Sequence, residues 1–391
     1  MLSVEQALQV VLDSAREVGT ERVDVGDALN RVLAEDVRSD VDMPPFNKSA
    51  MDGFACRRQD LGNELIVIET IPAGVSPRKA VGPGQCAKIM TGAVVPEAAD
   101  CVIMKEYVEM SGKDRIRFVG AKTADNICLR GEDVKAGDVV LRKGVLIKPQ
   151  HIAILASVGH VGPMVAKRPR VAVVATGDEL VEPAARPTGA QIRNSNSYQI
   201  SAQVANIGLA AANYGVVGDT VAAMDDIFNR AFSESDVVIV SGGVSVGDYD
   251  LVPHILRRSN FALLFEKVAV KPGRPTVFGI SGNGRCFALP GNPVSSFVMF
   301  ELLVKPFLYK MMGHDFRPAV SDRRLAKTIG RRKTDRDSWL PVAFTVDGGV
   351  AQIEYHGSAH IGALSGADGL LCAPAGVKEI KEGSIVAVRQ I

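Results

Sequence analysis

The sequence has little of what marks the specialised classes of protein. It contains six cysteines in 391 residues, and none of them forms a Cys-X-X-Cys pair, which argues against a disulfide framework or a zinc site. We therefore expect reduced thiols in a cytoplasmic protein. No apolar run approaches the roughly 20 residues that a transmembrane helix needs. Residues 1–18 are amphipathic and carry acidic side chains early, which argues against a signal peptide.

Neither positive nor negative charge is in excess. The formal net charge is +1, so no overall field favours nucleic acid or an anionic membrane, and we expect neither as a partner. The hydrophobic content of 47% and the charged content of 23% are typical of a globular protein. The length indicates about two to four domains.

The pattern of apolar residues changes along the chain and predicts a multidomain fold with α/β and β parts. Residues 1–42 and 143–169 should form an N-terminal helix and an elongated connector, and residues 43–142, with their short alternating runs, a mainly β domain. Between residues 170 and 315 strands and helices alternate, which predicts a doubly wound parallel sheet. Residues 316–391 return to short strands joined by glycines, which predicts a small β-barrel or sandwich.

The most informative stretch is residues 237–250, VVIVSGGVSVGDYD. Its apolar start predicts a buried strand, which Ser241, Gly242 and Gly243 end. In parallel α/β sheets ligands bind at the carboxyl ends of the strands, and glycines there let a ligand approach the backbone. The stretch favours a ligand site, although glycine-rich turns are ordinary in such domains.

Carboxylates follow several of the predicted strands in the same region. They are Asp178, Glu179, Asp219 and Asp250, with Asp248 as an alternative to Asp250. Because parallel strands end at one rim of the sheet, we expect these side chains to lie close together. Carboxylates at such a rim can hold a divalent cation beside a bound anion.

Two further segments offer groups that bind anions. Lys271 and Arg274 lie in the proline-flanked turn KPGRP and can hold an oxyanion, although a solvated basic turn has the same sequence. Asn292 suits the N-cap of the next helix and Pro293 its first position. The first amides of that helix favour an anion, but capping alone also explains both residues.

Three short motifs of the predicted β domain place polar residues in turns. They are NKSAMDGFA with Asp52, KIMTGA with Thr91, and RGED with Asp133. Taken singly, each motif is explained equally well by an ordinary surface turn.

Taken together, the motifs are far more specific. NKSAMDGFA, KIMTGA, RGED, VVATGDEL, SGGVSVGDYD, KPGRP and LPGNPVS follow one another along the chain, and in this order the sequence resembles the MoeA/gephyrin E-domain family over essentially its whole length. The resemblance implies that molybdate is inserted into the dithiolene of adenylylated molybdopterin, with Mg²⁺-assisted release of AMP. It also implies an elongated homodimer whose site lies between domains and subunits. Its pathway partners would be a molybdopterin adenylyltransferase and molybdoenzyme-maturation proteins.

The resemblance assigns roles to the motif residues position by position. The catalytic positions are Asp52, Thr91, Asp133 and Glu179. The metal-binding positions are Asp219 and Asp250. The positions that bind the molybdopterin substrate or molybdate are Ser241, Gly242, Gly243, Lys271, Arg274, Pro290, Pro293 and Ser295.

The sequence departs from the family pattern in a few places. The acids after Gly247 are spaced differently, so that Asp250 is aligned with the functional acid while Asp248 stays open. Pro341 stands where an arginine is expected, and Ala363 replaces a serine. The resemblance therefore does not carry over molybdate contacts from the C-terminal domain.

Two other functions are compatible with the same motifs. The gephyrin branch clusters receptors, so the chain could be a scaffold without catalysis, although a scaffold needs neither the acids nor the basic turn. An enzyme of the same type could instead handle tungstate. The two oxyanions are nearly equal in size and charge, and the sequence does not separate them.

Overall fold

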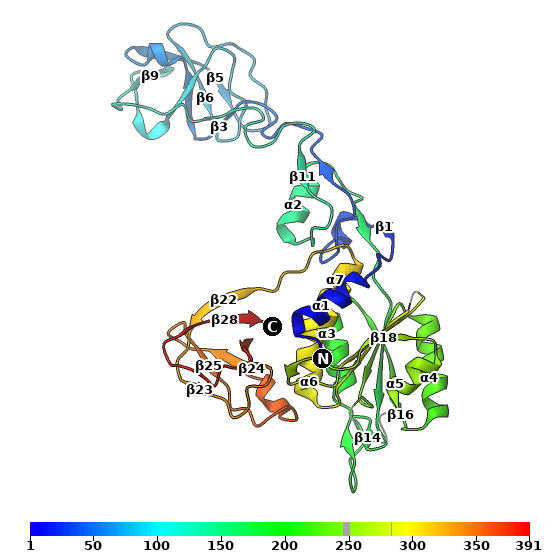
Figure 1. The fold of residues 1–391 in the computed structure, drawn as a ribbon. Helices are drawn as coiled ribbons and strands as arrows, with labels where there is room; N and C mark the ends of the chain where they lie inside the picture. The colour runs from blue at the N-terminus through cyan, green and yellow to red at the C-terminus, as the bar shows by residue number, and fades with distance from the viewer. Residues whose placement is uncertain (245–250, 283) are drawn as a thin grey trace.

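The computed structural model describes residues 1–244, 251–282 and 284–391. The molecule is elongated, with a β-rich domain at one end and the α/β and C-terminal domains side by side at the other (Figure 1). Asp248 and Asp250, the alternatives for one predicted metal-binding acid, lie outside the described residues.

Two antiparallel ribbons form the connector between the ends of the molecule. β1 (Thr20–Arg22) pairs with β12 (Met164–Ala166), and β2 (Val37–Arg38) pairs with β11 (Val139–Leu141). The helix α2 (Pro149–Ser157) lies beside them (Figure 1). The chain thus runs out to the β-rich domain and returns along the same path.

The β-rich domain contains a six-stranded sheet in the order β7-β4-β6-β5-β9-β8. Its inner strand β4 (Gly53–Cys56) is buried throughout, because Phe54 and Cys56 join one apolar cluster and Ala55 joins another. The remaining strands are β5 (Glu64–Ile71), β6 (Gln85–Ile89), β7 (Cys101–Met104), β8 (Val108–Met110) and β9 (Arg115–Phe118). The prediction of a mainly β domain is confirmed.

The α/β domain is built on a second six-stranded sheet, in the order β16-β13-β17-β21-β20-β18. Its strands are β13 (Val171–Thr176), β16 (Ala211–Val217), β17 (Val237–Ser241), β18 (Ala262–Phe265), β20 (Val277–Ser281) and β21 (Gly284–Leu289). The first four in the order are parallel, as predicted, whereas β20 and β18 are antiparallel. Only residues 282–283 separate β20 from β21, which leaves no room for the crossover that a parallel pair requires.

Helices cover both faces of this sheet. They are α3 (Asn196–Asn206), α4 (Val221–Glu234), α5 (Val252–Arg258) and α6 (Pro293–Met299). Val237 and Ile239 of β17 pack in the cluster that contains α3 and α6, while Val238 and Val240 pack in the cluster that contains α4 and α5. A strand buried on both faces needs a continuous apolar run, which explains the four consecutive apolar residues.

One continuous helical segment follows β21. It consists of α6, a π-helical turn η4 (Phe300–Val304) and α7 (Lys305–Met311). Pro306 lies in the first turn of α7, and its missing N–H accounts for the change in hydrogen bonding there. The N-terminal helix α1 (Val4–Asp13) shares the apolar core of this segment through Ala7 and Val11.

The C-terminal domain is a β-sheet in the order β19-β24-β26-β28-β22, with β25 paired to β24. Its strands are β22 (Val320–Arg324), β24 (Asp337–Phe344), β25 (Val350–Gln352), β26 (Gly369–Ala373) and β28 (Ile385–Gln390). The edge strand β19 (Val270–Lys271) comes from the α/β part of the sequence and pairs with β24 in parallel. The predicted basic turn therefore lies at the junction of two domains. No helix in the described ranges is long and apolar enough to cross a membrane.

Candidate functional site

A cavity of about 650 Å³ lies at the carboxyl ends of β13, β17 and β21. Thr176 ends β13, Ser241 ends β17, and Pro290 follows β21, and all three line the cavity. Residues 192–196, which precede or begin α3, form another wall. This is the edge of a parallel α/β sheet at which ligands bind.

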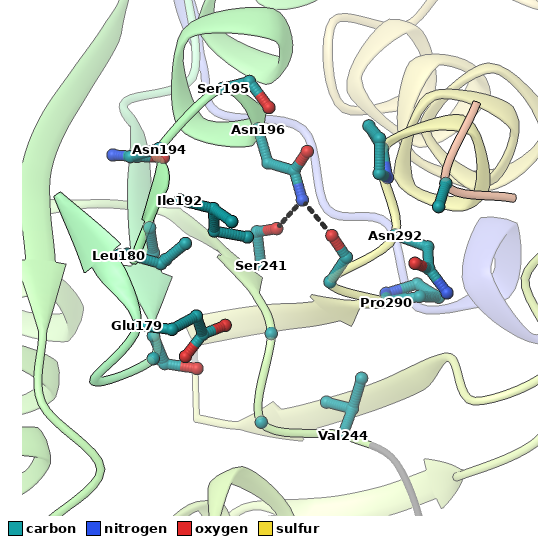
Figure 2. Close-up of a pocket in the computed structure, with 18 of the residues that line it drawn as sticks. Glu179, Leu180, Ile192, Asn194, Ser195, Asn196, Ser241, Val244, Pro290 and Asn292 are labelled. Atoms are coloured by element: carbon teal, nitrogen blue, oxygen red, sulfur yellow. Dashed lines mark hydrogen bonds between the residues drawn. The ribbon is translucent and has the colours of Figure 1, made fainter. Parts of the chain in front are cut away.

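Asn196 joins two sides of the cavity (Figure 2). Its Nδ2 donates to Oγ of Ser241 at 2.8 Å and to the carbonyl of Gly291 at 2.7 Å. The turn after β17 and the turn after β21 are thereby held together. The sequence analysis missed Asn196; its only signal was the run of polar residues at 193–197 around the start of α3.

Gly242 and Gly243 are required by the backbone. Gly242 has φ +101°, and a Cβ there would lie 2.5 Å from the carbonyl oxygen of Thr176. Gly243 has φ +65°, and its Cβ would lie 2.7 Å from Cγ2 of Val252. Side chains are excluded at both positions, so the cavity is bounded by bare backbone, and a ligand can approach it closely.

Two predicted carboxylates line the same cavity. Glu179 follows β13 and Asp219 follows β16, and both belong to the lining. Asp178 does not line the cavity; its Oδ1 accepts a hydrogen bond from the Asp219 backbone N–H at 3.0 Å. In the described parts of the chain, no three His, Cys, Asp or Glu side chains form a group that could hold a metal ion. In the described ranges, Glu179 and Asp219 are the two carboxylates of the lining.

The C-terminal domain closes one side of the cavity. Ala359 and Ile361 belong to the lining, and the carbonyl of Ser358 accepts the backbone N–H of Val294 at 3.1 Å. One of the first amides of α6 is therefore bonded to the C-terminal domain. Asn292 is the N-cap of α6, as predicted, but its side chain makes no capping hydrogen bond.

The structure separates the predicted binding residues into two groups. Ser241, Gly242, Gly243, Pro290 and Pro293 line the cavity, whereas Lys271, Arg274 and Ser295 do not. Ser295 is buried, while Lys271 and Arg274 are exposed. The basic turn reaches the cavity only through Pro275.

Asp52, directly before β4, and Thr91, after β6, belong to the β-rich domain, which lies at the other end of the molecule (Figure 1). Oδ1 of Asp52 accepts hydrogen bonds from the backbone N–H and the hydroxyl of Thr91. These bonds and the nearby Lys105 hold the pKa of Asp52 below its usual value. Both Asp52 and Lys105 line a separate cavity of about 330 Å³.

Asp133 lies in a third place, where the β-rich domain meets the connector. It lines a cavity of about 600 Å³ together with Arg38 of β2 and Ile154 of α2. Within one chain, therefore, Asp52, Thr91 and Asp133 do not meet Glu179 and Asp219.

Comparison with known proteins agrees with this arrangement of domains. The family models that match are the MoeA N-terminal region (domain I and II) at residues 2–159, a probable molybdopterin binding domain at 172–310, and the MoeA C-terminal region (domain IV) at 324–391. These three regions, with the cavity in the second, define a class of molybdenum cofactor biosynthesis proteins.

Individual proteins extend the similarity over the full length. A molybdopterin molybdenumtransferase of Staphylococcus epidermidis is 35% identical over 99% of this chain and 95% of its own. One of Staphylococcus aureus is 38% identical over 80% of this chain and 76% of its own. The crystal structure of the molybdopterin biosynthesis moeA protein from Pyrococcus horikoshii OT3 is 31% identical, covers 100% of both chains and gives a TM-score of 0.86. The chain belongs to the MoeA family.

Proposed function

We propose that this protein is an enzyme that inserts molybdenum from molybdate into the dithiolene of adenylylated molybdopterin and releases AMP. The observation that carries the proposal is the cavity of about 650 Å³, in which Glu179 and Asp219 share one lining with the bare Ser241–Gly243 turn. Open backbone can approach the phosphate oxygens of a ligand closely, and carboxylates beside them can hold the Mg²⁺ that assists cleavage of the phosphoanhydride bond to AMP. The similar proteins are named molybdopterin molybdenumtransferase, which agrees with the transfer of molybdenum to molybdopterin.

The turn after β17 is proposed to bind the substrate. Gly242 and Gly243 leave its backbone open, and Asn196 fixes its position against the Gly291 carbonyl. The Thr176 hydroxyl is buried in the same lining and makes no hydrogen bond with any residue of the described ranges. It is therefore available to donate to a ligand oxygen. These groups would orient the substrate without moving.

Glu179 and Asp219 are proposed to hold Mg²⁺. Mg²⁺ prefers oxygen ligands and is usually bound through one or two carboxylates together with phosphate oxygens. The two carboxylates that line the cavity in the described ranges match this preference of Mg²⁺. When bound, the ion supplies Lewis-acid polarisation of the phosphoryl group. Asp250, or Asp248, is the further ligand that the family resemblance suggests.

Molybdate is proposed to bind at the basic turn. Lys271 lies on β19, and the Nη1 of Arg336 donates to the carbonyl of Val270 beside it at 3.5 Å. Lys271, Arg336 and Arg274 thus place three cations at the domain junction. This position is outside the cavity that Glu179 and Asp219 line. A dianion held there avoids the repulsion of Glu179 and Asp219. Pro290, Pro293 and Ser295 shape the neighbouring turn.

The complete site is proposed to require a homodimer. Asp52, Thr91 and Asp133 would come from the partner subunit, because within one chain they lie away from the cavity (Figure 1). An elongated molecule whose two ends carry complementary parts of a site can complete both sites by antiparallel pairing. We place the dimer in the cytoplasm, between a molybdopterin adenylyltransferase and molybdoenzyme-maturation proteins.

The proposal is tested by measuring AMP release from adenylylated molybdopterin with Mg²⁺, in the presence and absence of molybdate. We expect release that depends on molybdate and yields active cofactor. Absence of release by the folded protein, together with capture of a receptor peptide, would instead favour the scaffold. Faster release with tungstate than with molybdate would identify tungstate as the substrate.

A further inference from the structure

A further cavity, of about 390 Å³, lies at the opposite end of the α/β sheet from the proposed active site. It is lined by residues 16–18 after α1, by Lys167, Arg168 and Arg170 before β13, by Asp236 before β17, and by Met311 at the end of α7. Asp236 and residue 170 precede the amino ends of their strands, whereas the proposed active site lies at the carboxyl ends. The two cavities are therefore separate.

The charged side chains that line this cavity are predominantly basic. Four cations and two carboxylates line it: Arg16, Lys167, Arg168, Arg170, Glu17 and Asp236. Both carboxylates have partners, since Oδ1 of Asp236 accepts from Nη2 of Arg170 at 3.0 Å and Oε2 of Glu17 lies 3.7 Å from Nζ of Lys143. Among the described residues, these partners leave neither acid of the lining paired with Lys167 or Arg168.

Lys167 and Arg168 carry this excess charge. Both side chains are exposed, and neither makes a hydrogen bond or ion pair with the described part of the chain. The position of Lys167 is fixed at the backbone, because its N–H donates to the carbonyl of Gly19 at 2.9 Å. Two adjacent cations are thus held at the cavity by the connector.

A buried arginine, Arg285, lies close enough to Arg16 of the cavity lining to interact with its charge. Arg285 is 3% exposed, and its guanidinium donates to the carbonyls of Ser14, Gly282 and Gly284 at 2.9, 3.1 and 3.0 Å. No carboxylate among the described residues forms an ion pair with it. Burial and the nearby Arg16 lower the pKa of Arg285. A buried cation without a counter-charge is costly, and an anion in the cavity would reduce that cost.

Two residues of the lining are apolar. Val18 and Met311 line the cavity, and the Val18 N–H donates to the Met311 carbonyl at 3.3 Å, which holds the two segments together. A lining that contains both cations and apolar groups suits a ligand that has a charged and an uncharged part. Pockets for small organic ligands usually have volumes of about 300–1,000 Å³.

We propose that this cavity binds a small phosphorylated organic molecule. Lys167 and Arg168 hold the phosphate oxygens, and Val18 and Met311 contact the organic part. Charge-assisted hydrogen bonds from lysine and arginine are the strong contacts for phosphate.

The site can be tested by calorimetric titration of the full-length protein with AMP. AMP also fits the proposed active site, so we expect two binding events per chain. The double variant K167Q/R168Q should lose one of them or weaken it by roughly tenfold or more. The matched variant R332Q/K333Q removes an adjacent, exposed Arg–Lys pair elsewhere and should retain both. Thermal melts check that each variant is folded.

Two results would overturn the proposal: AMP binding in K167Q/R168Q that is unchanged from the wild type, or tighter binding of hexaglutamate than of AMP at the same site. The last would assign the cavity to an acidic protein segment. Molybdate-dependent AMP release should be the same in K167Q/R168Q and R332Q/K333Q. This site and the proposed enzyme activity can therefore fail independently.

Discussion

Thr91 donates both its backbone N–H, at 2.8 Å, and its hydroxyl, at 2.9 Å, to the same oxygen of Asp52. The other carboxylate oxygen lies 3.5 Å from Nζ of Lys105. The two oxygens of Asp52 therefore have different partners, and the carboxylate has one preferred orientation. Thr91 and Asp52, two residues that the family resemblance treats separately, act as one unit in which Thr91 positions Asp52.

Replacing Thr91 by alanine should remove one of the two bonds and leave Asp52 less well oriented. We expect T91A to lower kcat/KM for molybdate-dependent AMP release by roughly five- to tenfold, the equivalent of one hydrogen bond. The pKa of Asp52 should rise toward its ordinary value, which carboxyl-carbon NMR titration measures. T91S keeps the hydroxyl and serves as the control. Equal activity of T91A and T91S would contradict a positioning role.

Gly242 and Gly291 offer a matched pair of substitutions in one cavity. An alanine at Gly242 would combine φ +101° with a Cβ 2.5 Å from the Thr176 carbonyl, whereas at Gly291 the nearest atom to a Cβ is 3.8 Å away. G242A should cost about 2 kcal/mol or more of unfolding free energy and abolish AMP release. G291A should change stability by less than about 0.5 kcal/mol. Chemical denaturation measures both, and similar losses in the two variants would refute the explanation.

Asn196 should act through the two turns that it joins. N196A removes the bonds to Ser241 and Gly291 and should raise KM by roughly tenfold, with a smaller effect on kcat. N196D should be worse, because a carboxylate cannot donate to the Gly291 carbonyl. N206A, an exposed asparagine at the other end of α3, is the control. Steady-state kinetics of the three variants measure KM and kcat. An N196D variant as active as the wild type would exclude the bridging role.

The Arg170–Asp236 pair should make stability depend on pH. Burial alone would raise the pKa of Asp236, but the hydrogen bonds from Arg170 outweigh it, and the pKa is lowered in the folded protein. Asp236 therefore stabilises the fold above its unfolded-state pKa of about 3.9. That stabilisation is lost as the pH falls through the lower folded-state pKa.

The change D236N should thus reduce the unfolding free energy at pH 7 by about 1 kcal/mol. The difference from wild type should shrink as the pH is lowered below about 4. D226N, on the exposed face of α4, should show no such pH-dependent difference. Denaturation at a series of pH values measures this, and a constant difference at all pH values would contradict the assignment.

Local patterns predicted much of the site. The strand β17 and the turn after it follow from an apolar run ended by Ser241, Gly242 and Gly243, and acids after strand ends led to Glu179 and Asp219. All five residues line one cavity. The carboxyl ends of parallel strands lie at one edge of the sheet, and this does not depend on the fold of the other domains.

The parts that depend on distant pairing were not predictable in this way. Asn196 bonds to groups 45 and 95 residues away, and no local pattern specifies such partners. Lys271 pairs with β24 of another domain. The basic turn, which the sequence assigned to the α/β domain, therefore lies at the junction of two domains. The four domain boundaries and the roles of the individual site residues stay predictions.

The central claim is that each active site uses residues of two chains. It can be tested by mixing two inactive variants, D52N and E179Q, under conditions in which subunits exchange. A mixed dimer has one site with both residues intact and one with neither. Random exchange of equal amounts makes half of the dimers mixed, so we predict recovery of about a quarter of the wild-type rate of molybdate-dependent AMP release. If Asp52 and Glu179 served the same site within one chain, no mixture would recover activity, and that result would contradict the account.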